Sequence, residues 1–313
     1  MLDVDTFLTT LYVIVDNFCQ SRVPPQRPAA GPEASLSSSE VVTLAIFARW
    51  SRFASERDFY RYAQTYLREA FPTLPNRSQF NRSVRHCLDL IEAVALHLVE
   101  MMKARRCPYE ALDSSAVPVR DAKRRGEGWM AGYADVGWSN SLGWYEGFRL
   151  LGGVSPAGVV TGFGFASAST KDQPLAETFF AARHEPNPRL PSVGSAAMGP
   201  YYVTDKGFEG EENHRRWLGL YGAGVICPPK RNGRKRRIWP KRLRRWAASI
   251  RQVVESVYEK LHTTFGLRRE RPHDLLAGLQ ARLAARVALD NFCIWLNEQL
   301  GRPRLAFADL LGW

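Results

Sequence analysis

The stretch Tyr-Glu-Ala-Leu-Asp at residues 109–113 is a mainly apolar run that ends in a carboxylate, and it indicates how the chain that follows it is expected to fold. A second run, Tyr-Tyr-Val-Thr-Asp at 201–205, has the same form. Both are typical of buried strands. A carboxylate at the end of such a strand is costly to desolvate unless a cation compensates its charge. The pattern predicts that Asp113 and Asp205 converge at neighbouring strand ends.

A third carboxylate, Glu255, lies in a helical stretch after these strands. At 100° per residue, Glu255 lies about 140° from Ile250, on a polar face that it shares with Arg251 and His262. A surface pair between Glu255 and Arg251 is the alternative, and Glu259, one turn further on, is a rival third acid. The apolar stripe expected to face the sheet consists of Ile250, Val253, Val254, Val257 and Leu261.

Converging hard oxygen ligands are the usual way to hold Mg²⁺ in proteins. Two such ions can hold a phosphodiester during in-line attack. The three carboxylates therefore favour strand chemistry on DNA or RNA. A strand-end aspartate can also cap the following turn, and Asp113, which precedes Ser114 and Ser115, has this alternative open.

The chain carries a formal net charge of +12, which indicates a polyanionic partner. Ten of the basic residues lie between 230 and 250, a stretch without acids, and without them the formal charge would be +2. Trp239 and Trp246 are interleaved with these cations, which favours a nucleic-acid surface over a merely solvated charge run. The candidate DNA-binding residues are Lys230, Arg231, Arg234, Lys235, Arg236, Arg237, Lys241, Arg242, Arg244 and Arg245.

The 313 residues suggest one large domain and one smaller domain. Residues 1–105 are expected to form a helical N-terminal domain, with a proline-rich linker at 24–32 and a capping box at 37–40. The polar start of its last helix, 77–82, could contact DNA or simply begin a packing helix. Helices are expected at 3–20, from the capping box to about Phe53, near 55–70 and at 78–103.

From about residue 106 the pattern changes to strands interspersed with helices. Strands at 109–113, 144–151 and 159–165 are expected to be antiparallel, and later strands parallel. That mixed sheet flanked by helices is similar to the ribonuclease H-like layout. The later elements are a helix at 176–183, the strand ending at Asp205, a helix at 211–221, a short strand at 224–229, a helix at 246–264 and a long C-terminal helix.

Other sequence features exclude several classes of protein. The five cysteines are scattered and never spaced Cys-x-x-Cys, which supports neither a disulfide framework nor a zinc knuckle. No apolar stretch reaches membrane-spanning length, and no basic leader precedes the first apolar residues. We therefore expect a soluble cytoplasmic protein with no membrane partner.

Several of these stretches resemble the DDE transposases of bacterial insertion sequences. Leu-Asp-Ser-Ser-Ala-Val-Pro at 112–118 is similar to the first-acid strand of that family. Gly-Phe-Arg-Leu at 147–150 resembles its hairpin motif, often Gly-Phe-Lys-Leu-His, and Thr-Asp-Lys-Gly-Phe at 204–208 resembles its second-acid motif, commonly Asp-Lys-Gly-Tyr. Residues 38–41 and 74–77 look like its helical N-terminal part.

The third acid also fits the resemblance. Arg251 stands four residues before Glu255, as in the family signature Tyr-x-x-Arg-x-x-x-Glu-x-x-x-x-x-x-Lys, and this prefers Glu255 to Glu259. The chain departs from the signature with Ala248 in place of Tyr and His262 in place of Lys. The hairpin motif has Leu151 in place of His.

The resemblance implies a ribonuclease H-like catalytic domain at 106–313 and metal-dependent cleavage and strand transfer at the ends of an insertion sequence. In that scheme Asp113 bridges two Mg²⁺ ions, for which Mn²⁺ can substitute, while Asp205 and Glu255 each complete one site. Lys206 and Arg251 are candidate phosphate contacts, and glycine at 207 would allow a sharp turn. The partner would be double-stranded DNA, bound by a homodimer associated with the nucleoid.

Two other functions remain open at this point. One is a catalytically silent, transposase-derived DNA-binding protein, and the other is a ribonuclease H-like nuclease without strand transfer. The tryptophans at 129, 138 and 144 are expected to pack in the core, with base stacking by one of them as the alternative.

Overall fold

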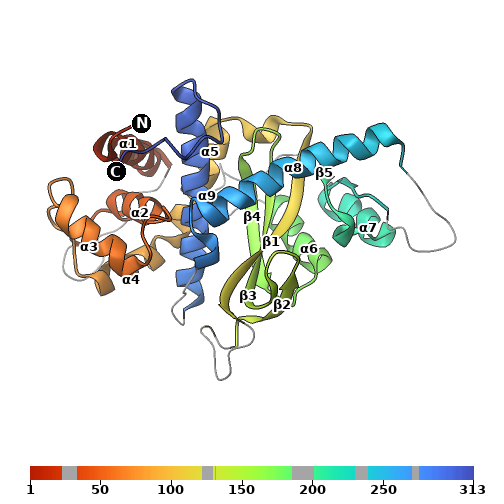
Figure 1. Cartoon of the computed structure of the whole chain (residues 1–313), viewed down its shortest axis with the longest axis horizontal. Helices are drawn as coiled ribbons and strands as arrows, with labels where there is room; N and C mark the ends of the chain where they lie inside the picture. Colours follow the sequence, from red (N-terminus) through yellow and green to blue (C-terminus); the bar gives the residue numbers. More distant parts are fainter. Residues whose placement is uncertain (23–33, 122–129, 131, 185–200, 230–238, 270–274) are drawn as a thin grey trace. The chain divides into compact units, whose positions relative to one another are not determined.

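The structure is a computed structural model that describes residues 1–22, 34–121, 130, 132–184, 201–229, 239–269 and 275–313 (Figure 1). It forms two compact units. One unit comprises Met1–Leu98 with Thr263–Trp313, and the other comprises Val99–His262. The expected linker at 24–32 lies outside the described residues.

The first unit is helical, as expected for the N-terminal part. A capping box starts its second helix: the Ser37 hydroxyl accepts from the Glu40 N–H at 3.2 Å and the Glu40 carboxylate accepts from the Ser37 N–H at 2.6 Å. Two expected boundaries are wrong: this helix ends at Phe47, and the stretch predicted at 78–103 is two helices separated at Cys87. The helices are α1 (Val4–Arg22), α2 (Ser38–Phe47), α3 (Glu56–Tyr66), α4 (Arg77–His86) and α5 (Leu88–Met101).

The C-terminal helix α9 (Leu276–Gln299) packs in this first unit, against α2 and α4. The sequence-based division instead placed it with residues 106–313. Most of its apolar residues are buried, and so are two arginines: Arg282 pairs with Glu56 at 2.8 Å, and Arg286 donates to the Phe265 carbonyl at 2.7 Å. These partners come from the same unit and compensate the buried charges.

The second unit contains a mixed sheet with the strand order β2-β3-β1-β5-β6, and β4 also pairs with β3. β1 is antiparallel to β3, and β3 to both β2 and β4, whereas β1–β5 and β5–β6 are parallel. This confirms the ribonuclease H-like mixed α/β fold with a helical N-terminal part. The strands are β1 (Tyr109–Asp121), β2 (Asp135–Ser139), β3 (Gly143–Val154), β4 (Val160–Ser167), β5 (Tyr201–Val203) and β6 (Val225–Ile226).

Helices cover both faces of this sheet (Figure 1). Leu112 and Leu151 pack with Phe179 of α6 (Asp172–His184) and Trp217 of α7 (Glu211–Tyr221). Successive residues of a strand point to opposite faces. The neighbouring Gly152 accordingly faces α8 (Lys241–Thr263), where an added Cβ would lie 3.0 Å from the Tyr258 hydroxyl oxygen.

A buried ion pair joins β1 to α6. Glu110 is fully buried, and its carboxylate accepts from Arg183 at 2.7 Å and from the Thr161 hydroxyl at 2.7 Å. Two glycines leave room for it: a Cβ on Gly153 would lie 3.0 Å from the Glu110 carboxylate, and one on Gly162 would lie 2.8 Å from the Arg183 guanidinium. The backbone at Gly153 and Gly162 therefore packs closely around both charged groups.

Removing one partner of this pair should be strongly destabilising. We expect Arg183→Met to lower the free energy of unfolding by about 3–5 kcal/mol, because the fully buried Glu110 carboxyl group would lose its charged partner. The double variant Glu110→Gln/Arg183→Met should be destabilised by clearly less than the sum of the two single variants. Urea unfolding of the full chain measures both, and additive effects would contradict the coupling.

Candidate active site

The structure brings Asp113 and Asp205 together through the parallel pairing of β1 and β5. Ala111 pairs with Val203 in that register, and each aspartate lies two residues beyond its member of the pair. Two residues along a strand return to the same face, so both aspartates lie on one side at the end of the parallel pairing. The expectation that Asp113 ends its strand is wrong, because β1 continues to Asp121 against β3.

Each aspartate accepts a hydrogen bond from a backbone N–H that follows it. Asp113 Oδ1 accepts from Ser114 at 2.8 Å, and Asp205 Oδ1 accepts from Gly207 at 2.7 Å. The Asp205 contact caps a short 3₁₀ helix, Lys206–Phe208. Oδ2 of either aspartate makes no hydrogen bond within the described part of the chain. One oxygen of each carboxylate is thus oriented while the other stays open.

The surroundings of Asp113 disfavour the charged form of its carboxyl group. Burial is the largest influence on its carboxyl group and raises the pKa to about 7. The carboxylates of Asp205 and Asp172 also raise this pKa, whereas the Ser114 N–H and Arg251 lower it. A part-buried carboxylate with two acidic neighbours gains strongly from a nearby cation.

Helix α8 is fixed to the strand at Asp113. The Tyr258 hydroxyl donates to the Asp113 carbonyl at 2.8 Å and the Leu150 carbonyl at 3.1 Å. One turn later, His262 Nε2 lies 2.8 Å from the Ser115 hydroxyl. Of the expected stripe, Ile250, Val254, Val257 and Leu261 are buried and Val253 is partly buried.

Glu255 lies three residues before Tyr258 on this helix but does not join the two aspartates. Its side chain is 59% exposed and pairs with Arg251 at 3.3 Å, which is the surface pair considered as the alternative. Glu259 is also exposed. Across the described residues, no three His, Cys, Asp or Glu side chains are close enough to hold a metal ion.

A fourth carboxylate near the aspartates, Asp172, was missed by the sequence analysis. Its Oδ1 accepts from Arg149 at 2.7 Å and from the Ser114 hydroxyl at 2.8 Å. Burial alone would lower the pKa of Arg149, but Asp172 raises it above its ordinary value. In the sequence Asp172 stands four residues before the helix expected at 176–183, which in the structure begins at Asp172 itself. The arginine of the hairpin motif, to which no partner was assigned, was the only hint of this contact.

A family model, the transposase DDE domain, matches residues 111–289. The chain belongs to the DDE transposase family. The matched residues include both aspartates, Asp172 and Glu255. No curated protein and no solved structure gives a significant match. Enzymes of the DDE transposase family act on DNA in transposition and generally use a divalent metal.

The transposase domain exposes several of the expected DNA-binding cations. Lys206 is exposed, and Arg251 is partly exposed. Helix α8 begins earlier than expected, at Lys241, so that its first turns carry four cations at the surface. These are Lys241, Arg242, Arg244 and Arg245, whereas Lys230, Arg231, Arg234, Lys235, Arg236 and Arg237 lie outside the described residues.

Two tryptophans of the transposase domain are exposed instead of packing in the core. Trp138 and Trp144 are paired across β2 and β3 and are 48% and 66% exposed. β2 was not foreseen from the sequence. The core expectation is therefore wrong for these two residues, while Trp129 lies outside the described residues.

Gly207 is needed for space and not for the sharp turn that was expected. Its backbone stays out of the left-handed region. A Cβ there would lie 2.6 Å from Asp172 Oδ2 and 2.9 Å from Asp205 Oδ1. Only glycine fits between these two carboxylates.

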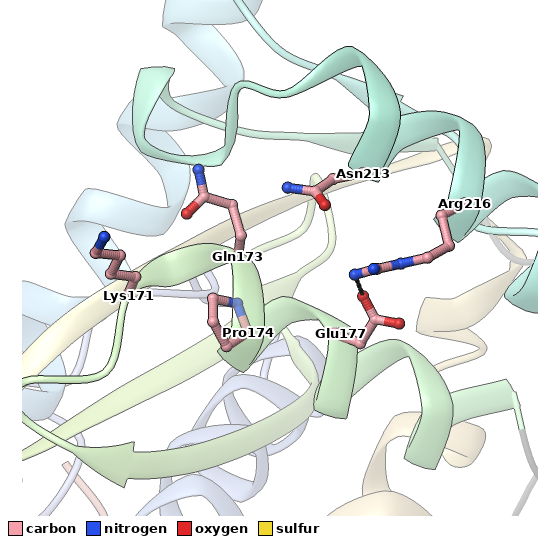
Figure 2. A pocket seen from close by; sticks show the side chains of 6 residues that line it. All are labelled: Lys171, Gln173, Pro174, Glu177, Asn213 and Arg216. Carbon is pink, nitrogen blue, oxygen red and sulfur yellow. Dashed lines mark hydrogen bonds and ion pairs between the residues drawn. The ribbon is translucent and has the colours of Figure 1, made fainter.

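Next to Asp172 the transposase domain has an open pocket of about 440 Å³ (Figure 2). Figure 2 shows Arg216 turned toward Glu177, with which it forms an ion pair. Lys171 and Gln173, the neighbours of Asp172 in the sequence, line the same pocket, together with Pro174 and Asn213. Five of the six lining residues are polar or charged, and Asp113, Asp205 and Glu255 are not among them.

No helix in the described part of the transposase is long and apolar enough to cross a membrane. All five cysteines lie in the described residues, and no disulfide bond joins any two of them.

The Tyr258 contact can be tested by removing one oxygen atom. Tyr258→Phe should lower the free energy of unfolding by about 1–2 kcal/mol, because the buried hydroxyl that donates to two carbonyls is removed. The matched control is Tyr66→Phe on α3, where the side chain is 68% exposed and a change within about 0.5 kcal/mol is expected. Equal effects in urea unfolding would show that Tyr258 does not hold α8 in place.

Proposed function

We propose that this DDE transposase cuts DNA at the ends of a bacterial insertion sequence and joins them to target DNA. Asp113, Asp205 and Glu255 are its catalytic, metal-binding acids. The observation that carries the proposal is the matched position of Asp113 and Asp205, each two residues beyond the Ala111–Val203 pair, inside a domain of this family.

The two aspartates suit a divalent cation such as Mg²⁺ or Mn²⁺. Both offer carboxylate oxygens, which are the preferred ligands of these ions. The backbone N–H bonds to Oδ1 leave Oδ2 of each for coordination. When bound, two such ions would activate the attacking oxygen and stabilise the leaving oxygen.

Glu255 would become the third metal-binding acid by breaking its ion pair with Arg251. Tyr258 fixes α8 at Asp113, and Glu255 lies one turn before it on the same helix. An exposed ion pair contributes only about 0–1 kcal/mol, so a nearby cation readily outcompetes it. Arg251, released from Glu255, is then available to a DNA phosphate.

The basic start of α8 is proposed as a DNA backbone contact. Its cations at 241, 242, 244 and 245 lie at the surface, and they continue the basic stretch that begins at Lys230. Contacts of this kind position DNA without reading its sequence. Lys206, directly after Asp205, would add a phosphate contact beside the acids, and a homodimer would hold the two element ends.

The proposed activity can be measured with end-labelled DNA carrying the sequences that flank the coding region. With Mg²⁺, the full chain should nick this DNA and join it to a supercoiled plasmid. Asp113→Ala, Asp205→Ala and Glu255→Ala should each reduce the rate on the order of 100-fold or more, the decrease typical of removing one group that stabilises a transition state.

Glu259→Ala is the matched control, one turn after Glu255 on the same exposed side of α8, and it should stay active. Activity that survives Glu255→Ala but not Glu259→Ala would move the third acid to Glu259. Cleavage without joining would indicate a nuclease, and salt-sensitive binding without cleavage would indicate a catalytically silent DNA-binding protein.

The DNA contact should also appear in the salt dependence of binding. Changing the four cations at 241, 242, 244 and 245 to Gln should reduce the slope of log K against log salt by up to about 0.9 for each phosphate that is no longer neutralised. Fluorescence anisotropy with a DNA duplex from about 50 to about 200 mM salt measures this slope.

A variant with scattered charge changes separates a local contact from net charge. Arg106, Arg215 and Arg268 are exposed and lie on different elements. Their joint change to Gln should leave the slope nearly unchanged. An equal reduction per charge in both variants would contradict a specific contact on α8.

A further inference from the structure

Asp172 occupies a central position between the segments that carry the two aspartates. It is the first residue of α6 and comes from a part of the chain that follows β4. Its carboxylate contacts β1 through Ser114 at 2.8 Å and β3 through Arg149 at 2.7 Å. Its other oxygen, Oδ2, lies against Gly207 in the turn after β5.

Ser114 and Gly207, which both contact Asp172, orient the other two aspartates through their backbone N–H groups. Ser114, whose hydroxyl donates to Asp172, donates its own N–H to Asp113 at 2.8 Å. Gly207, which packs against Asp172, donates its N–H to Asp205 at 2.7 Å. A single carboxylate therefore supports both backbone groups that fix the rotation of Asp113 and Asp205.

Arg149 compensates the charge that this arrangement places beside the two aspartates. Asp172 and Arg149 are both largely buried, with side chains 20% and 19% exposed. A short, charge-assisted bond stabilises the Asp172 carboxylate and holds its Oδ1 toward β1 and β3. Arginine in the motif at 147–150 thus has a structural partner, and Oδ2 is left to face Gly207.

We propose that Asp172 is a positioning residue for the metal-binding acids: through Ser114 and Gly207 it sets the orientation and spacing of Asp113 and Asp205. The inference rests on the proposed function, because it assumes that these two acids hold a divalent cation. Groups that orient metal ligands commonly change metal affinity by about 10–100-fold when they are removed.

The test is Mn²⁺ binding by the full chain, measured as free Mn²⁺ by electron paramagnetic resonance. Asp172→Asn should weaken binding by about 10–100-fold. Ser114→Ala, which removes only one hydroxyl group, should weaken it less. In the double variant the effects should fall short of additive, because both changes interrupt the same contact.

Glu212→Gln is the charge-matched control, since this exposed α7 residue loses the same charge without touching the aspartates. It should leave Mn²⁺ affinity unchanged. DNA binding by Asp172→Asn should also stay unchanged while its rate of nicking falls. A purely structural role would instead lower the melting temperature and DNA binding together.

Other results would overturn the inference. Unchanged Mn²⁺ affinity in Asp172→Asn, with binding abolished in Asp113→Ala, would refute the positioning role and leave the proposed function intact. Weaker binding in Asp172→Asn with no effect of Ser114→Ala would make Asp172 a ligand itself, not a positioning residue. Mn²⁺ binding that survives Asp113→Ala would contradict the proposed function and, with it, this inference.

Discussion

The hydroxyl group of Tyr258 holds helix α8 against the sheet of the second unit. It bonds to the carbonyls of Asp113 and Leu150, so one atom ties α8 to two neighbouring strands at the level of the first acid. Gly152 permits this approach, since a Cβ there would lie 3.0 Å from that oxygen. Glu255 and Arg251 precede Tyr258 by one and two turns. Their distance from the aspartates therefore depends on this contact more than on their own pairing.

The positions of the two aspartates could be foreseen from the sequence, because apolar runs and strand alternation determine them. The order of antiparallel and parallel strands followed from the same patterns. The state of Glu255 could not be foreseen. Helical periodicity placed it on a polar face with Arg251, and that face is compatible with both a surface pair and a metal ligand. Side-chain rotation, which periodicity does not encode, decides between them.

The contacts of Asp172 and the exposure of two tryptophans could not be predicted from apolar runs or periodicity. The contacts of Asp172 join residues 114, 149 and 207, and no local signal links positions so far apart. Trp138 and Trp144 face each other across the β2–β3 hairpin and are exposed. The sequence did not reveal this, because β2 has no clear apolar run. In helix α9 the arginines Arg282 and Arg286 are buried, because Glu56 and the Phe265 carbonyl compensate their charges. The sequence analysis made no prediction for these two residues.

The enclosed pair of Glu110 and Arg183 has a consequence for how this domain can diverge. Neither residue can be replaced alone without leaving a charge inside the protein. Gly153 and Gly162 add a further constraint, because a Cβ would press against Glu110 at 3.0 Å in the first case and against Arg183 at 2.8 Å in the second. Substitutions at these four positions should therefore be inherited together. Across related sequences, the four should vary as one correlated group although they are far apart along the chain.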